Sequence, residues 1–247
     1  MPDLKTPEPT GSHRREGRSR ASEAVEDYAK AIHALAEREP GPVGTSALAE
    51  RLGVSPGTVT AMLKRMAVLG LLRHEPYRGV ELTTAGERLA LEVIRHHRLL
   101  ESFLAEALGM PWDRVHDEAE VLEHYISEDL EERIAAALGD PDHDPHGDPI
   151  PDRQFVLTED AGVPLASLEP GSGGTFSRVS DGRPEMLRYL DECGIRPGAH
   201  LQVRRREPFG GAVVVKAGGG EWSLGPDLAE RMLIDADSPP DAEGSNR

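Results

Sequence analysis

The sequence predicts a mainly α-helical protein that ends in a small β domain. Apolar residues recur at helical spacing through most of residues 22–138, which favours a series of amphipathic helices. After residue 170 the chain changes to short, glycine-punctuated strand patterns, which are typical of a small barrel. No run approaches 18 apolar residues and the N-terminus lacks an apolar signal region, so we expect a cytoplasmic protein.

The charge of the chain is unevenly distributed. The formal net charge is −16, and residues 101–170 alone carry 19 acidic against 3 basic residues, a local balance of −16. Residues 41–80 instead hold five basic and two acidic residues, a balance of +3. A locally basic lobe on an acidic protein is compatible with DNA binding. The single Cys193 excludes a disulfide within one chain, and we expect it to be a small core residue.

We expect residues 1–20 to be a disordered tail. A helix is expected over residues 22–38, with Ser22 as its N-cap. Asp27 lies beside the apolar stripe of this helix. By itself, Asp27 is most simply a solvated surface carboxylate.

Residues 45–52 and 56–71 predict two helices joined by a glycine-containing turn, which is a helix-turn-helix. Ser55 is the expected N-cap of the second helix, and Pro56 occupies its first position. Small polar residues at the start of this helix lie where a recognition helix meets bases and phosphates.

Two strand-like pieces, residues 71–74 and 80–83, follow and predict a β-hairpin wing. Residues 21–85 are therefore expected to form a winged helix-turn-helix domain, with a helical hairpin that does not touch DNA as the alternative. The residues expected to contact DNA are Ser55, Pro56, Gly57, Thr58, Thr60, Lys64, Arg65, Tyr77 and Arg78.

Two further helical patterns, residues 84–107 and 113–138, carry histidines and carboxylates at helical spacing. On the first, His97 and Glu101 are four residues apart. The second carries, at offsets of zero, four, seven and eight, His116, Glu120, Glu123 and His124. Buried carboxylates are costly unless they are paired or bind a metal, and imidazole with carboxylate suits divalent cations. From spacing alone, a metal site and a solvated acidic face both fit.

An acidic, proline-rich linker over residues 146–170 is expected between a helical domain and the β domain. For His143 and His146 we favour a solvated loop over metal capture. The β domain is expected to contain strands at residues 174–179, 199–205, 211–215 and 221–224, helices at 184–193 and 226–232, and a disordered tail at 237–247.

With these elements in order, residues 25–235 resemble the diphtheria-toxin-repressor family of metal-dependent transcriptional regulators. The most specific motif is RVHDEAEVLEHYISE at residues 114–128, supported by HHRLLE and DPHGDPIP. The chain is most similar to the manganese-responsive branch that keeps a C-terminal SH3-like (FeoA-type) domain. The resemblance implies a metal-binding and dimerisation domain over residues 86–145 and the SH3-like domain over residues 171–236.

The resemblance also implies two metal sites. The regulatory site falls on Asp27, His97, Glu120, Glu123 and His124. The ancillary site falls on His97, Glu101 and His116, with a ligand from the SH3-like domain for which Asp181 is the candidate and a plain turn residue the alternative. His97 can serve either site, so the partition between them stays open.

The branch assignment rests on two positions. Iron-responsive relatives have Met and Cys where this chain has Asp27 and Glu120, and the oxygen donors favour Mn²⁺. Fe²⁺ is the alternative ion, and Zn²⁺ or Co²⁺ can substitute. Lys30 stands where manganese-type members often have a second Glu, which argues against a two-manganese cluster of that type.

The resemblance therefore implies a metal-dependent repressor of metal-ion homeostasis genes. It would act as a homodimer on double-stranded operator DNA, with neither a membrane nor a small-molecule substrate as partner. An iron-responsive repressor, a winged-helix regulator without metal control and a carboxylate-bridged metalloenzyme are the alternatives. Di-iron enzymes need Glu-x-x-His pairs, and Val121 and Ile94 stand where those glutamates would be.

Overall fold

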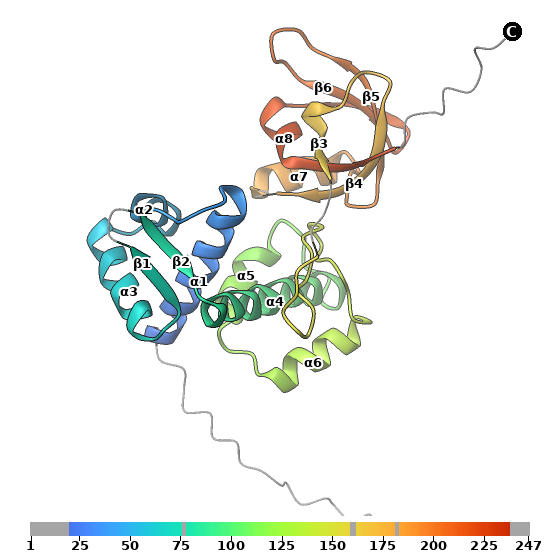
Figure 1. Cartoon of the computed structure of the whole chain (residues 1–247). Helices are drawn as coiled ribbons and strands as arrows, with labels where there is room; N and C mark the ends of the chain where they lie inside the picture. The colour runs from blue at the N-terminus through green and yellow to red at the C-terminus, as the bar shows by residue number, and fades with distance from the viewer. Residues whose placement is uncertain (1–19, 76–77, 159–161, 181–182, 238–247) are drawn as a thin grey trace, which may run out of the picture. The chain divides into compact units, whose positions relative to one another are not determined.

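The computed structural model describes residues 20–75, 78–158, 162–180 and 183–237, and the tails expected to be disordered fall almost wholly outside these ranges. The chain divides into two compact units, the first ending at Thr83 and the second beginning at Thr84 (Figure 1). Within the described ranges, none of the helices combines the length and apolar character that crossing a membrane requires.

The first unit begins with three helices, α1 (Arg20–Arg38), α2 (Thr45–Leu52) and α3 (Pro56–Val68). Between α2 and α3 the chain turns at Gly53, whose φ of 64° is the left-handed conformation that glycine adopts without strain. Ser55 caps α3 as expected, because its Oγ accepts a hydrogen bond from the backbone N–H of Thr58 at 3.1 Å. The buried side chains of this unit include Tyr28, Ile32, Leu48, Val59, Leu63 and Met66.

The wing is an antiparallel hairpin of β1 (Leu72–Glu75) and β2 (Gly79–Leu82). The segment before α2 joins it, because the N–H of Val43 donates to the carbonyl of Val80 at 2.8 Å and the reverse bond is 3.0 Å long. Gly79 has a φ of 109°, and a Cβ there would lie 2.7 Å from the Val43 carbonyl oxygen. Only glycine therefore allows this close approach.

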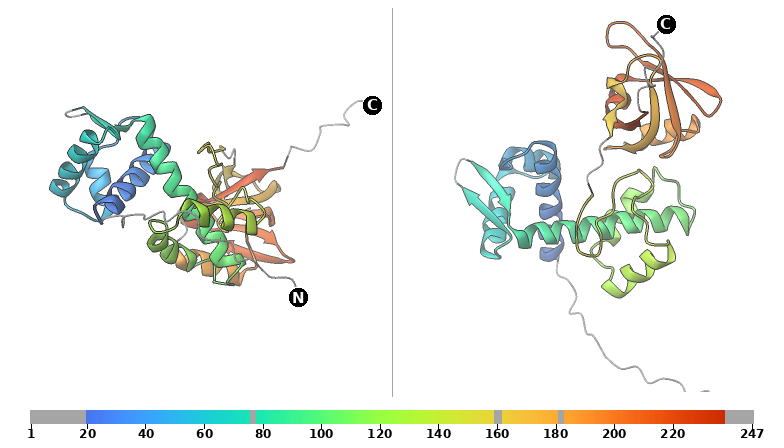
Figure 2. Two further views of the ribbon diagram at one scale, coloured as in Figure 1. Left: turned by 90° about the horizontal axis from the view of Figure 1, so that it is seen from below. Right: turned by 45° about the vertical axis from the view of Figure 1, so that its right-hand side comes forward.

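The second unit begins with the long helix α4 (Thr84–Glu106), against which α5 (Val115–Leu122) and α6 (Glu128–Ala137) pack (Figure 2). Their shared apolar core contains Leu99, Leu100, Ala119, Ile126, Ile134, Ala135 and Ile150.

The expectation of one continuous helix over residues 113–138 is wrong. The chain leaves the helical conformation after Leu122, and a new helix starts where the Ser127 Oγ accepts a hydrogen bond from the backbone N–H of Leu130 at 3.2 Å. No glycine or proline marks the break. The break places Ile126 in the same core as Leu99 and Leu100 of α4, so packing acts together with the Ser127 cap.

The chain ends in a six-stranded antiparallel sheet with the order β3-β8-β4-β5-β6-β7. Its strands are β3 (Val163–Pro164), β4 (Gly173–Val179), β5 (His200–Arg206), β6 (Val213–Ala217), β7 (Gly220–Leu224) and β8 (Met232–Ala236). A short 3₁₀ turn, η1 (Leu165–Ser167), and the helices α7 (Pro184–Glu192) and α8 (Pro226–Arg231) complete the domain. Four strands were expected, whereas β3 lies in the expected linker and β8 follows α8 directly.

The core of this sheet domain includes one residue from the helical part of the unit, Trp112, which is 1% exposed. The guanidinium of Arg196 lies 4.8 Å above the Trp112 ring, and the His146 ring stacks against Trp112 with centroids 5.8 Å apart. Cys193 is buried in the same core, where burial raises the pKa of its thiol. The helical part and the sheet domain therefore share apolar contacts.

Candidate metal centre

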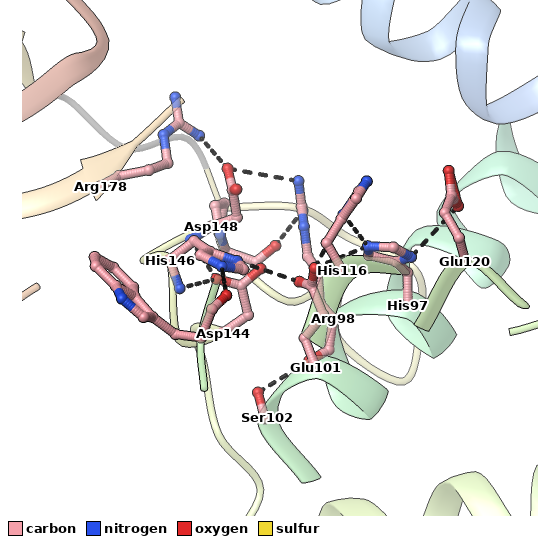
Figure 3. A network of polar contacts seen from close by, with 12 residues as sticks. His97, Arg98, Glu101, Ser102, His116, Glu120, Asp144, His146, Asp148 and Arg178 are labelled. Atoms are coloured by element: carbon pink, nitrogen blue, oxygen red, sulfur yellow. Dashed lines mark hydrogen bonds and ion pairs between the residues drawn. The ribbon is translucent and has the colours of Figure 1, made fainter. Parts of the chain in front are cut away.

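His97 on α4 is the point where the predicted metal ligands converge. Its Nε2 lies 3.0 Å from Glu101 Oε1 and 3.1 Å from His116 Nδ1 (Figure 3). Its Nδ1 lies 2.5 Å from Glu123 Oε2 and 3.7 Å from Glu120 Oε2. One imidazole ring therefore faces a different donor group with each of its nitrogens.

The first group consists of His97, Glu101 and His116. Glu101 is 2% exposed and its Oε1 lies 3.1 Å from His116 Nδ1, whereas the His116 side chain is 59% exposed and opens the group to solvent. Burial alone would raise the pKa of Glu101, but the charge of His97 and hydrogen bonds from the surrounding histidines hold it well below its usual range. The carboxylate is thus available as an anionic ligand.

The second group consists of His97, Glu120 and Glu123, with His124 beside it. Glu123 is fully buried, at 0% exposure, and its Oε1 lies 3.7 Å from His124 Nε2. Glu120 is on α5, whereas Glu123 and His124 follow the last residue of that helix. The expected stripe on one continuous helix is therefore interrupted, although its residues still come together.

A buried polar network that spacing did not predict holds the backbone behind Glu123. His96 Nδ1 lies 3.2 Å from the Glu123 carbonyl oxygen, and its Nε2 lies 3.0 Å from Glu131 Oε2. Arg95 donates to Glu131 Oε1 at 2.5 Å. Burial would raise the pKa of Glu131, but hydrogen bonds from His96 and Arg95 lower it, so the carboxylate stays charged. The sequence signal available for this network was the pair Arg95 and His96, which directly precede the predicted ligand His97.

His146 is also buried, which corrects the expectation of a solvated loop, although His143 is exposed as expected. His146 Nδ1 lies 3.6 Å from Glu101 Oε2, and its Nε2 lies 2.8 Å from the Trp112 carbonyl oxygen. Burial lowers the pKa of His146, but the hydrogen bond and charge of Glu101 outweigh it and raise the pKa to about 9. Glu101, Asp144 and His146 bring donor atoms within 4.8 Å of one another.

Three other predicted residues belong to the first unit or to segments outside the described ranges. Asp27 is half-buried on α1 in the first unit, one helical turn before Lys30. Asp181 and Tyr77 lie outside the described residues.

The predicted DNA-contacting residues of α3 are exposed. Ser55, Pro56, Gly57, Thr58 and Thr60 form its N-terminal end, with Lys64 and Arg65 further along the helix. Arg78, the residue before β2, is exposed as well. This end of the helix therefore presents small polar groups and then positive charge to solvent.

The donor chemistry fits a divalent cation. In each of the two groups, the one formed by His97, Glu101 and His116 and the one formed by His97, Glu120 and Glu123, the ligand atoms lie within 4.8 Å of one another. The donors are imidazole nitrogens and carboxylate oxygens, which suit Mn²⁺, Fe²⁺ and Zn²⁺. A bound cation would also offset the cost of burying these carboxylates.

Three family profiles match the chain. "Iron dependent repressor, N-terminal DNA binding domain" matches residues 21–80, and "Iron dependent repressor, metal binding and dimerisation domain" matches residues 83–152. "FeoA domain" matches residues 163–236.

Relatives of known name align along most of the chain. The iron-dependent repressor IdeR of Mycobacterium tuberculosis is 33% identical over 229 residues, which cover 86% of this chain and 97% of that protein. The diphtheria toxin repressor of Corynebacterium diphtheriae is 29% identical over 223 residues, covering 86% and 97%.

Solved structures of similar proteins superpose well. A manganese-dependent transcriptional repressor in complex with manganese has a TM-score of 0.78 and 41% identity, covering 85% of this chain and 98% of that one. ScaR with bound Zn²⁺ has a TM-score of 0.71 and 30% identity, covering 85% and 98%.

Proposed function

This chain belongs to the iron-dependent repressor family of metal-dependent transcriptional repressors, and we propose that Mn²⁺ is the ion to which it responds. It is a DNA-binding regulator rather than an enzyme. The proposal is carried by Glu120, whose carboxylate lies with His97 and Glu123. The family resemblance implies a cysteine at this position in iron-responsive relatives. An all-oxygen-and-nitrogen donor set favours Mn²⁺, which lies at the weak end of the affinity series and gains little from sulfur. The 41% identical structure named as manganese-dependent supports the same ion.

We assign the regulatory ion to Glu120, Glu123 and His124 together with Asp27, which is carried over from the family resemblance. We assign the ancillary ion to His97, Glu101 and His116, and the His97 ring is available to both sites. When bound, a divalent ion supplies positive charge at these carboxylates. Without that charge, the neighbouring Glu120 and Glu123 carboxylates repel each other.

Asp27 belongs to the helices that carry the DNA-reading α3, whereas Glu123 belongs to the helical part of the second unit. Shared coordination would therefore restrict how α3 is presented to DNA. Operator affinity would rise by the free energy with which the ion prefers the DNA-competent arrangement, typically a factor of roughly 5–150.

We propose that the protein acts as a homodimer on double-stranded operator DNA, controls metal-ion homeostasis genes and works in the cytoplasm, where that DNA is. The surface of α5 and α6 and their connection exposes several large apolar side chains, which a second copy could cover. These are Val121, Leu122, Tyr125 and Leu130. Two copies of α3 held about one DNA turn apart would match successive major grooves.

Replacing Lys64 or Arg65 by alanine should weaken binding to operator and to unrelated DNA about equally. Both side chains are exposed on α3, where phosphate contacts are expected, so each loss should reduce the salt-dependence slope by about 1. Fluorescence anisotropy at several salt concentrations measures the slope. Lys216→Ala, at an exposed position of β6, is the matched control and should change nothing. An unaltered slope in both α3 variants would remove these residues from the DNA contact.

Iron is the second candidate, because the relatives of 33% identity are named iron-dependent repressors. Operator duplexes selected from a random pool can be titrated with chelator-treated protein and with Mn²⁺, Zn²⁺ or, without oxygen, Fe²⁺. Mn²⁺ at micromolar concentration should give the largest gain in affinity. A larger gain with Fe²⁺ would transfer the proposal to iron, and equal affinity for chelator-treated and loaded protein would reject metal control of this chain.

A further inference from the structure

We propose that His96 is a positioning residue for Glu123, and that it acts on the main chain of Glu123 rather than on its carboxylate. The inference rests on the proposed metal-responsive function. It assigns a role to a buried histidine that lies outside both the predicted ligand set and the two assigned metal sites.

Two neighbouring histidines of α4 contact opposite ends of Glu123. His97 Nδ1 lies 2.5 Å from Glu123 Oε2, whereas His96 Nδ1 lies 3.2 Å from the Glu123 carbonyl oxygen. Because a carbonyl can only accept, the proton is on His96 Nδ1 and the ring donates. Glu123 is therefore attached to α4 through its side chain and also through its main chain.

The contact with His96 lies where α5 ends. Leu122 is the last residue of α5, and Glu123 is its fully buried C-cap. The last carbonyl groups of a helix have no donor within the helix, and a buried carbonyl without a partner is costly. His96 supplies a donor to this carbonyl. It therefore stabilises the end of α5 at the point that brings Glu123 and His124 beside His97.

His96 is itself held by residues outside the proposed metal sites. Its Nε2 lies 3.0 Å from Glu131 Oε2 on α6. Arg95 donates to Glu131 Oε1 at 2.5 Å and to the Pro151 carbonyl oxygen at 2.6 Å. Arg95, His96 and Glu131 are all buried. This network fixes the orientation of the His96 ring, so the ring can hold the Glu123 carbonyl in one place.

A supporting residue that orients a ligand typically contributes 10–100-fold to metal affinity. Two amides separate this role of His96 from simple packing. The amide nitrogen of asparagine lies roughly where Nδ1 lies in histidine, whereas that of glutamine lies roughly where Nε2 lies. His96→Asn thus keeps a donor toward the Glu123 carbonyl, and His96→Gln keeps only the contact with Glu131.

The first experiment titrates full-length protein with Mn²⁺ and follows free Mn²⁺ by electron paramagnetic resonance. Glu123→Gln identifies the binding step that belongs to Glu123. We expect His96→Gln to weaken that step by about tenfold or more, and His96→Asn to weaken it distinctly less. The other step should change little in either variant. In the Glu123→Gln background, His96→Gln should have no further effect.

Two further variants complete the titration. His96→Leu fills the space of the ring without a donor, so it should match His96→Gln and replaces it if the glutamine variant does not fold. His143→Gln, at an exposed histidine, is the matched control and should bind Mn²⁺ like the wild type.

The second experiment needs no metal. Amide hydrogen exchange of the metal-free proteins, followed by mass spectrometry, reports on the end of α5. Exchange across residues 119–127 should be faster in His96→Gln than in the wild type, because the Glu123 carbonyl loses its donor. His96→Asn should exchange at close to the wild-type rate.

Several results would overturn the inference. If glutamine preserved Mn²⁺ affinity better than asparagine, the contact with Glu131 would be the one that matters. If both binding steps weakened equally, His96 would support the fold in general rather than Glu123. Wild-type affinity in His96→Gln would show that Glu123 does not need His96. Wild-type protein that binds no Mn²⁺ would instead reject the proposed function, and with it the metal role of His96, whatever the exchange rates.

Discussion

We expect that replacing Glu123 by glutamine will leave the protein folded and dimeric but will remove the gain in operator affinity that Mn²⁺ is proposed to give the wild type. The Glu123 side chain is fully buried, and its oxygens lie 2.5 Å from His97 Nδ1 and 3.7 Å from His124 Nε2. An amide keeps the shape of the carboxylate but lacks its charge, so it cannot serve a hard divalent ion equally well. Anisotropy titrations with Mn²⁺ and with chelator measure the difference.

The expected wild-type gain, roughly 5–150-fold, should fall to none in this variant. Glu118→Gln is the matched control, because Glu118 is an exposed glutamate of α5, and it should respond to Mn²⁺ like the wild type. Asp27→Asn should show the same loss as Glu123→Gln if Asp27 is a ligand of the regulatory ion. Sedimentation checks that each variant remains dimeric. A full Mn²⁺ response in Glu123→Gln would remove Glu123 from the regulatory site.

Replacing Trp112 by alanine is expected to produce the largest loss of stability, about 3–5 kcal/mol. Trp112 is 1% exposed in the apolar core of the sheet domain, although it comes from the helical part of the unit. The change empties this shared core and removes the ring that Arg196 and His146 contact. Urea unfolding followed by far-ultraviolet circular dichroism should show an earlier transition, and limited proteolysis should release the sheet domain.

Phe209→Ala provides the matched control, since Phe209 is an aromatic residue of the same domain with a fully exposed side chain. Its unfolding midpoint should stay within the range of ordinary surface substitutions, about 0.5 kcal/mol. If Trp112→Ala unfolds at the same urea concentration as Phe209→Ala and resists protease equally, the two parts do not depend on a shared core.

The sequence by itself determined the features that short-range chemistry controls. Ser55 and Pro56 predict the start of α3, and the structure confirms both the cap and the first-turn proline. The spacing of His97 and Glu101 brings their side chains together on one face of α4. These predictions succeed because each depends on residues within about one helical turn of each other.

The interruption after α5 has one local signal, Ser127, which caps α6 ahead of an acidic first turn. Residues 123–127 contain no helix-breaking residue, and the acidic pattern continues across them. The burial of Ile126 against partners on α4, more than twenty residues earlier in the chain, favours the break. Helical periodicity depends only on residues close in sequence. It therefore predicts a helix that continues through residues 123–127.

Tertiary structure alone decided the parts of the site that depend on distant partners. His146 meets Glu101 and Trp112 across 45 and 34 positions of sequence, and β8 finds its place between β3 and β4. Whether a histidine in a polar, proline-rich stretch is solvated or buried depends on which surfaces close over it. That choice depends on long-range packing and hydrogen bonding, for which local composition carries no signal.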